Sequence, residues 1–61
     1  MKIKTLLSNY FDYFTIYATN ANGDDIVLAT HESSEKELKK LWNKKISTIH
    51  AEDYTLAIYI K

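Results

Sequence analysis

Tyrosine side chains are the feature of this sequence best suited to a binding surface. Each one offers a large apolar ring together with a hydroxyl group that donates or accepts a hydrogen bond. In two alternating segments, tyrosine and threonine fall on one side and apolar residues on the other. We expect the outward side to contact a protein partner, or a second copy of the chain in a homodimer, through Tyr13, Thr15, Tyr17, Val27, Thr55 and Tyr59.

These residues also have a purely structural interpretation. Cross-strand pairs of tyrosine and threonine stabilise a sheet by about 0.2–1 kcal/mol per pair. Val27 and Ala29 are predicted to share the tyrosine side, which makes that side more apolar than solubility requires. The sequence leaves both interpretations open.

Lysines form a second candidate surface, on the outer side of a predicted helix: Lys36, Lys39, Lys40 and Lys44. Combined with tyrosines that stack on unpaired bases, they define the alternative function, binding of single-stranded nucleic acid. Eight lysines balance eight acidic residues, and arginine is absent, so the basic excess typical of nucleic-acid binding is missing. A solvated helix face is the leading interpretation of this surface.

Catalytic and metal-binding chemistry is not predicted. The chain has no Cys, and its two imidazoles, His31 and His50, are expected at opposite ends of the sheet. Ser34 and its neighbours fit as helix caps and turn residues, and a single Gly cannot build a phosphate-binding loop. We therefore predict no enzymatic activity, no metal and no cofactor.

Two pairs of acidic residues, at positions 24–25 and 52–53, are expected to gather at one end of the sheet. Oxygen clusters bind hard cations such as Ca²⁺, but no calcium-loop spacing is present. Lys44 and Lys45 are predicted to reach the same end. Salt bridges or plain solvation are therefore favoured over a metal site.

The first predicted element is a short helix over residues 3–11. Ile3, Leu6, Leu7 and Tyr10 recur with helical spacing on one side. No strong N-cap residue precedes this stripe, so an edge strand at residues 2–4 is the alternative.

A β-hairpin is predicted next. Residues 13–19 alternate with a period of two and are rich in β-branched and aromatic types. The pair Asn22-Gly23 tolerates the positive φ angles of tight turns. Residues 25–30 then form the second strand.

A second helix is predicted over residues 34–46, and a last strand over residues 54–61. Ser34 and Glu37 match the capping box that opens many helices. The apolar stripe of this helix contains Leu38, Leu41 and Trp42, with Trp42 expected in the core. Residues 50–53 are expected to be a polar connection.

These elements predict one small α+β domain over residues 1–61, with the order α-β-β-α-β. We expect a three-stranded sheet of order 2-1-3, antiparallel throughout, with the most aromatic strand in the middle. Both helices would cover one face through Leu6, Leu7, Leu38, Leu41 and Trp42. The tyrosines would lie on the other face.

Length and composition bear on the oligomeric state of the protein and on its cellular compartment. A chain of 61 residues has a limited core, which a dimer could complete. The basic start at residues 1–7 resembles a signal peptide, but its apolar run breaks at Ser8 and no cleavage site follows. No segment has the length of a membrane span, and Cys is absent. We therefore expect a cytoplasmic protein, in the host cytoplasm if a phage encodes it.

Three stretches of the sequence resemble short proteins of bacteriophages and prophages in Gram-positive bacteria: Ile3-Lys4-Thr5-Leu6-Leu7, Phe14-Thr15-Ile16-Tyr17 with Asn22-Gly23, and Tyr54-Thr55-Leu56-Ala57-Ile58. The amino-acid composition, rich in Lys, Asn, Ile and Tyr, is similar to that of proteins encoded by AT-rich genomes. The resemblance implies an accessory role, such as binding and modulating a host protein. We therefore predict a non-enzymatic protein that acts through protein–protein interaction.

Overall fold

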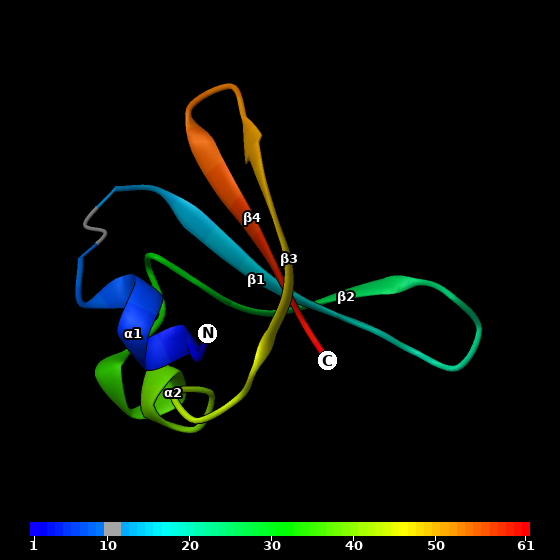
Figure 1. Ribbon diagram of the computed structural model, residues 1–61, viewed down its shortest axis with the longest axis horizontal. Coiled ribbons are helices and arrows are strands. Elements are labelled where there is room, and N and C mark those ends of the chain that lie inside the picture. The colour runs from blue at the N-terminus through cyan, green and yellow to red at the C-terminus, as the bar shows by residue number, and fades with distance from the viewer. Residues whose placement is uncertain (10–11) are drawn as a thin grey trace.

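The computed structural model describes residues 1–9 and 12–61 as a small α+β fold (Figure 1). Its elements are α1 (Ile3–Leu7), β1 (Phe14–Thr19), β2 (Asp25–Thr30), α2 (Glu35–Lys39), β3 (Ile46–Glu52) and β4 (Thr55–Ile60). The predicted α+β class is confirmed. The predicted number of strands was wrong, because the sheet has four.

The strands lie in the order β2-β1-β4-β3. β1 therefore lies between β2 and the last strand of the chain, as predicted. The prediction of an antiparallel sheet was wrong at the centre, where β1 and β4 pair in parallel and Ile16 faces Ile58 in register. The outer pairs, β1 with β2 and β3 with β4, are antiparallel.

The unexpected strand β3 explains the parallel pairing. The predicted helix over residues 34–46 ends at Lys39, and residues 46–52 form β3 where a helix end and a polar connection were expected. Ile46, Thr48 and Ile49 are β-branched, which favours a strand. A tight turn then leads into β4, with Glu52 paired to Thr55. This additional reversal makes β4 run in the same direction as β1.

The two helices are shorter than predicted. α1 ends at Leu7, four residues before the predicted end at residue 11, and residues 10–11 of the predicted helix lie outside the described residues. Lys2 forms an isolated bridge with Lys45, so the alternative strand at residues 2–4 exists only at that position. In α2, the Ser34 hydroxyl accepts a hydrogen bond from the Glu37 backbone N–H at 3.3 Å, which forms that half of the predicted capping box.

The predicted β1–β2 hairpin is confirmed, and it projects away from the helices (Figure 1). Gly23 has φ 85°, and its N–H donates to the Asn20 carbonyl at 3.0 Å. The Asn20 side chain accepts two further backbone hydrogen bonds, from Asn22 at 2.8 Å and Asp24 at 3.0 Å. Asn20 and Gly23 together therefore close the turn.

A bulge in the hairpin changes which side chains share a face. Tyr17 pairs with Val27, but the next residue back along β1, Ile16, pairs with Ala29. The inserted residue shifts the alternation of β2 by one position. Ala29 is consequently buried in the core, and its predicted place beside Val27 on the tyrosine side was wrong.

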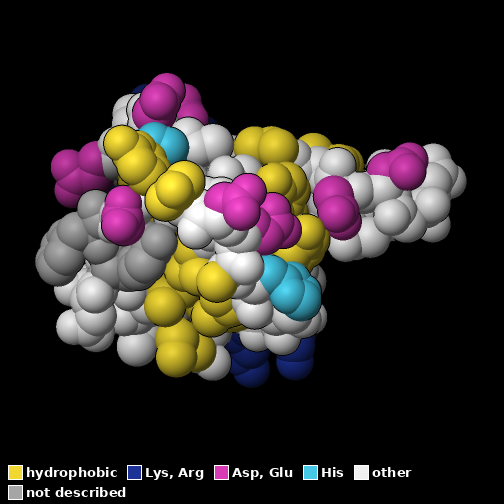
Figure 2. Space-filling view, turned by 90° about the horizontal axis from the view of Figure 1, so that it is seen from above, with side chains coloured by type: hydrophobic (Ala, Val, Ile, Leu, Met, Phe, Trp, Pro, Cys, Tyr) yellow, Lys and Arg dark blue, Asp and Glu magenta, His cyan; other side chains and the backbone are white. Residues whose placement is uncertain are grey.

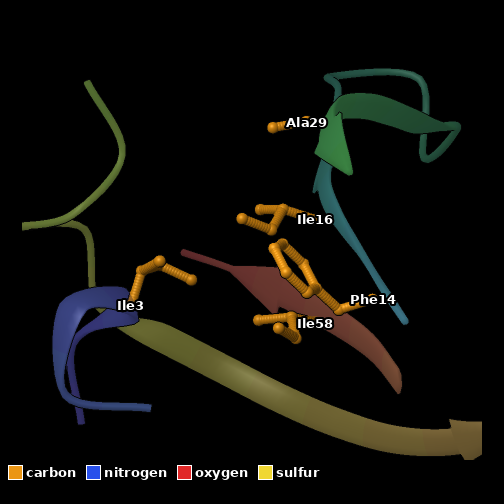
Figure 3. Close-up of a cluster of buried hydrophobic side chains, with 5 residues drawn as sticks. All are labelled: Ile3, Phe14, Ile16, Ala29 and Ile58. Carbon is orange, nitrogen blue, oxygen red and sulfur yellow. The ribbon is translucent and has the colours of Figure 1, made fainter. Parts of the chain in front are cut away.

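The core lies between the sheet and the helices. Figure 3 shows Ile3 of α1 reaching toward Phe14, Ile16 and Ile58 of the central strands, while Ala29 comes from β2. The predicted helix stripe packs on this cluster and is partly buried: Leu6, Leu7, Leu38, Leu41 and Trp42. The helices therefore cover one face of the sheet, as expected.

The turn at Gly23 gives a direct test of the hairpin. A Cβ atom added at Gly23 meets no atom within 4 Å, so only the left-handed backbone opposes a side chain there. Gly23→Ala should lower the free energy of unfolding by about 1 kcal/mol, measured by urea denaturation. Gly23→Asn is the matched control and should cost less, since Asn tolerates this conformation. Equal stability of Gly23→Ala and the parent would contradict the described turn.

Candidate functional site

The sheet face opposite the helices is the candidate site, and we call it the tyrosine face. Strand register and alternation assign to it Thr15, Tyr17, Asp25, Val27, His50, Glu52, Thr55 and Tyr59. It brings together every predicted partner-binding residue except Tyr13, which precedes β1.

A stacked pair of tyrosines forms the centre of the tyrosine face. The rings of Tyr17 and Tyr59 lie on neighbouring strands in register, with centroids 5.1 Å apart and an angle of 19° between their planes. The His50 ring meets Tyr59 edge-on at 5.8 Å. Such aromatic pairs contribute about 0.5–1.5 kcal/mol beyond the area they bury. The rings are therefore held in defined positions.

The tyrosine face is partly open to solvent. Tyr17, Tyr59, Thr15 and Thr55 are half-buried, and Val27 is 56% exposed. The phenol rings are thus not sealed inside the monomer. They remain accessible to a partner along one side.

Tyr13 precedes β1 at one end of the sheet, whereas the Tyr17–Tyr59 stack lies further along that strand. Its ring meets His31 edge-on at 4.6 Å, and 54% of the residue is exposed. A hollow of about 460 Å³ opens there, lined by Asp12, Tyr13, Ala51, Asp53, Tyr54, Thr55 and Leu56. Tyr54 belongs to the β3–β4 turn and is 88% exposed. The sequence placed it in a strand, because the turn followed the unrecognised β3.

The acidic residues do not gather as predicted. Asp25 pairs with Thr19 at the end of β1, whereas Glu52 pairs with Thr55, beside the start of β1. The parallel β1–β4 pairing separates the two acidic pairs. All four acids are exposed, and Thr19 donates a hydrogen bond to the Asp25 carboxylate at 3.3 Å. Alternation along β2 and β3 places one acid of each pair, Asp25 and Glu52, on the tyrosine face.

The two acids on the tyrosine face act on the same phenol. The pKa of Tyr59 is raised above its ordinary value of 10.0, first by burial of the phenol and then by the negative charges of Asp25 and Glu52. Tyr17 and a side-chain hydrogen-bond contribution from Asp25 raise it further. An acid loses its proton less readily where negative charge surrounds it. Asp25 and Glu52 therefore both place negative charge near Tyr59.

The lysines lie with the helices, on the other side of the sheet. Lys36 and Lys39 are in α2, Lys40 caps it, and Lys44 lies beyond its end instead of on the predicted helix face. Lys39 forms an ion pair with Glu35, at 3.6 Å, and its ammonium lies 6.0 Å from the centre of a Trp42 ring. These lysines and the tyrosine stack do not share a surface.

The histidines lie closer to one end of the sheet than predicted. The His31 backbone N–H donates to the Phe14 carbonyl at the start of β1, while His50 pairs with Ala57, the register partner of Thr15. The prediction of opposite ends was wrong, because it assumed an antiparallel last strand. Among residues 1–9 and 12–61, no three His, Asp or Glu side chains group in a way that could hold a metal ion.

Comparison with known proteins adds no relative. No protein-family model, no curated protein and no solved structure matches the chain. Of the helices in the described part of the chain, neither is long and apolar enough to span a membrane.

The influence of Asp25 on Tyr59 can be measured by titration. Asp25→Asn should lower the pKa of Tyr59 toward 10.0, followed by NMR of the Tyr59 ring carbon, while Asp24→Asn makes the same charge change off the face and should shift it less. Because the pKa of Tyr59 is higher in the folded chain than in the unfolded chain, this residue's contribution to stability is lost as the pH rises above about 10. An unchanged Tyr59 titration in Asp25→Asn would contradict the described electrostatics.

Proposed function

We propose that the protein is a non-enzymatic binding protein, of the kind expected from a phage or mobile element, that holds a protein partner on its tyrosine face. The observation that carries this proposal is the Tyr17–Tyr59 stack, half-buried on the sheet face that the helices leave uncovered. Modulation of a host protein is the role that such binding would serve.

The stack suits recognition for an energetic reason. Tyrosine is enriched among the few residues that provide most of the binding energy at interfaces. Rings that are already fixed by stacking lose little conformational entropy when a partner covers them. Tyr17 and Tyr59 meet this condition, because β1 and β4 hold them in register.

Apolar residues at the hairpin extend the surface that a partner could cover. Ile26 is 45% exposed, Val27 56% and Leu28 37%. They belong to β2, an edge strand of the sheet. Val27 shares the tyrosine face with Tyr17, its register partner. Ile26 pairs with Ala18 and lies on the opposite side of the sheet, so Val27 is the residue through which the tyrosine face reaches this exposed apolar edge.

The arrangement of charges favours a protein over single-stranded nucleic acid. A strand that stacks on the tyrosines would need its phosphates near lysines. The four strands contain no lysine, and the tyrosine face has Asp25 and Glu52 instead. Phosphates at this face would meet like charges.

A double variant tests the function. Tyr17→Ser combined with Tyr59→Ser should retain the fold, seen by circular dichroism, and weaken retention of the partner in pull-downs from the native host by at least about tenfold. Tyr54→Ser is the matched control, because this exposed tyrosine lies in a turn outside the face. Equal partner retention by the double variant and the parent would exclude the tyrosine face as the binding site.

The nucleic-acid alternative has a separate test. Titration with a single-stranded oligonucleotide at low and moderate salt should produce no binding. Salt-sensitive binding that Lys36→Gln and Lys40→Gln weaken would favour the alternative.

A further inference from the structure

We propose that the segment bound by the tyrosine face is cationic, with a lysine or arginine side chain seated on the Tyr17–Tyr59 stack between Asp25 and Glu52. This inference rests on the proposed function and specifies the chemistry of its partner. It commits to a basic protein segment rather than to a second copy or a nucleic acid.

The first argument is the kind of charge that the strands carry. The chain is neutral overall, with eight lysines and eight acids. All of its lysines lie outside the strands: Lys2, Lys4, Lys36, Lys39, Lys40, Lys44, Lys45 and Lys61. The charged residues within the strands are Asp25 and Glu52, both on the tyrosine face. In the view of Figure 2, acidic and hydrophobic side chains spread over the surface, and lysines appear only at its margins.

The second argument is the chemistry of the aromatic rings. A cation is attracted to the face of an aromatic ring within about 6 Å of its centre, and a guanidinium group also stacks on the ring. The stacked rings of Tyr17 and Tyr59 offer an apolar support, and Asp25 and Glu52 supply the opposite charge. Strand register assigns both carboxylates to the same face as the stack.

Contacts between a cation and an aromatic ring also occur beside the helices of this protein. The ammonium groups of Lys4 and Lys39 each lie 6.0 Å from the centre of a Trp42 ring. There, the aromatic ring already has its cations, and Lys39 also has a carboxylate partner in Glu35. The tyrosine face has rings and carboxylates in a similar combination, but the chain places no lysine in its strands.

A symmetric dimer through the tyrosine face fits this charge pattern poorly. A two-fold axis places the same patch of both copies in contact. Both copies would then bring Asp25 and Glu52 into one interface, which would hold four carboxylates and no strand lysine, and such unbalanced like charge opposes binding. A basic partner segment neutralises these acids instead.

Peptide titration of the full chain tests the inference. The probe is an eight-residue peptide that alternates Lys and Thr, with Glu–Thr and Gln–Thr peptides of equal length as controls. We expect the Lys–Thr peptide to shift the NMR signals of Tyr17 and Tyr59 and to bind more weakly as salt is raised, because salt screens exposed charges. The two control peptides should leave these signals unchanged.

Charge variants give the second measurement. Asp25→Asn and Glu52→Gln should each weaken binding of the Lys–Thr peptide about two- to fivefold, the range for partly exposed ion pairs. Asp24→Asn is the matched control and should stay within about twofold of the parent, because Asp24 lies in the turn beside Asp25.

The outcomes separate this inference from the proposed function. Equal binding of all three peptides, or equal affinity of Asp25→Asn and Asp24→Asn, would overturn the cationic preference. The proposed function would still stand if the tyrosine double variant loses its partner. A chain that binds no peptide but doubles its mass in light scattering would identify a second copy as the occupant and also overturn the inference. Failure of the proposed function itself would appear as unchanged partner retention by the double variant.

Discussion

The parallel pairing of β1 with β4 is the interaction on which the rest of this structure depends. It joins Ile16 to Ile58, both fully buried, and on the opposite face it joins Tyr17 to Tyr59. A single ladder therefore organises the core and the tyrosine face together. Because side chains alternate along a strand, a slip of one residue would exchange the two sets. Burial of Ile16 and Ile58 thereby fixes the position of the tyrosine stack.

The helices cover only the isoleucine side of the sheet. α1 and α2 pack on the isoleucine side through Ile3 and the partly buried leucines, and they contain Lys4, Lys36 and Lys39. The tyrosine side is left with hydroxyl groups, His50 and two carboxylates. The strands of this neutral chain thus contain two acidic residues, both on the tyrosine face, and no lysine. This asymmetry favours a partner of opposite charge over a strand of nucleic acid.

Two departures from regular strand geometry refine the surface. The bulge at the step between Ile16 and Tyr17 turns Ala29 into the core and leaves Val27 outside, so the hairpin contributes an apolar residue at the edge of the tyrosine face. At the other end, Asp53 has φ 46° and permits the tight turn from β3 to β4. That turn positions Glu52 opposite Thr55 and exposes Tyr54. The bulge and the turn at Asp53 each determine, through the local backbone conformation, which side chains are exposed.

The sequence by itself determined the features that depend on neighbouring residues. The period of two assigned Tyr17 and Tyr59 to one face, Asn22-Gly23 indicated the hairpin, and Ser34 marked the start of α2. Tertiary structure decided that residues 46–52 form a strand, since a short β-branched stretch becomes a strand when it finds a partner, here β4. That pairing set the direction of β4, separated the acidic pairs and brought Glu52 to the tyrosine face, where the β1–β2 pairing places Asp25. Contacts between distant residues create these features, and no local pattern encodes them.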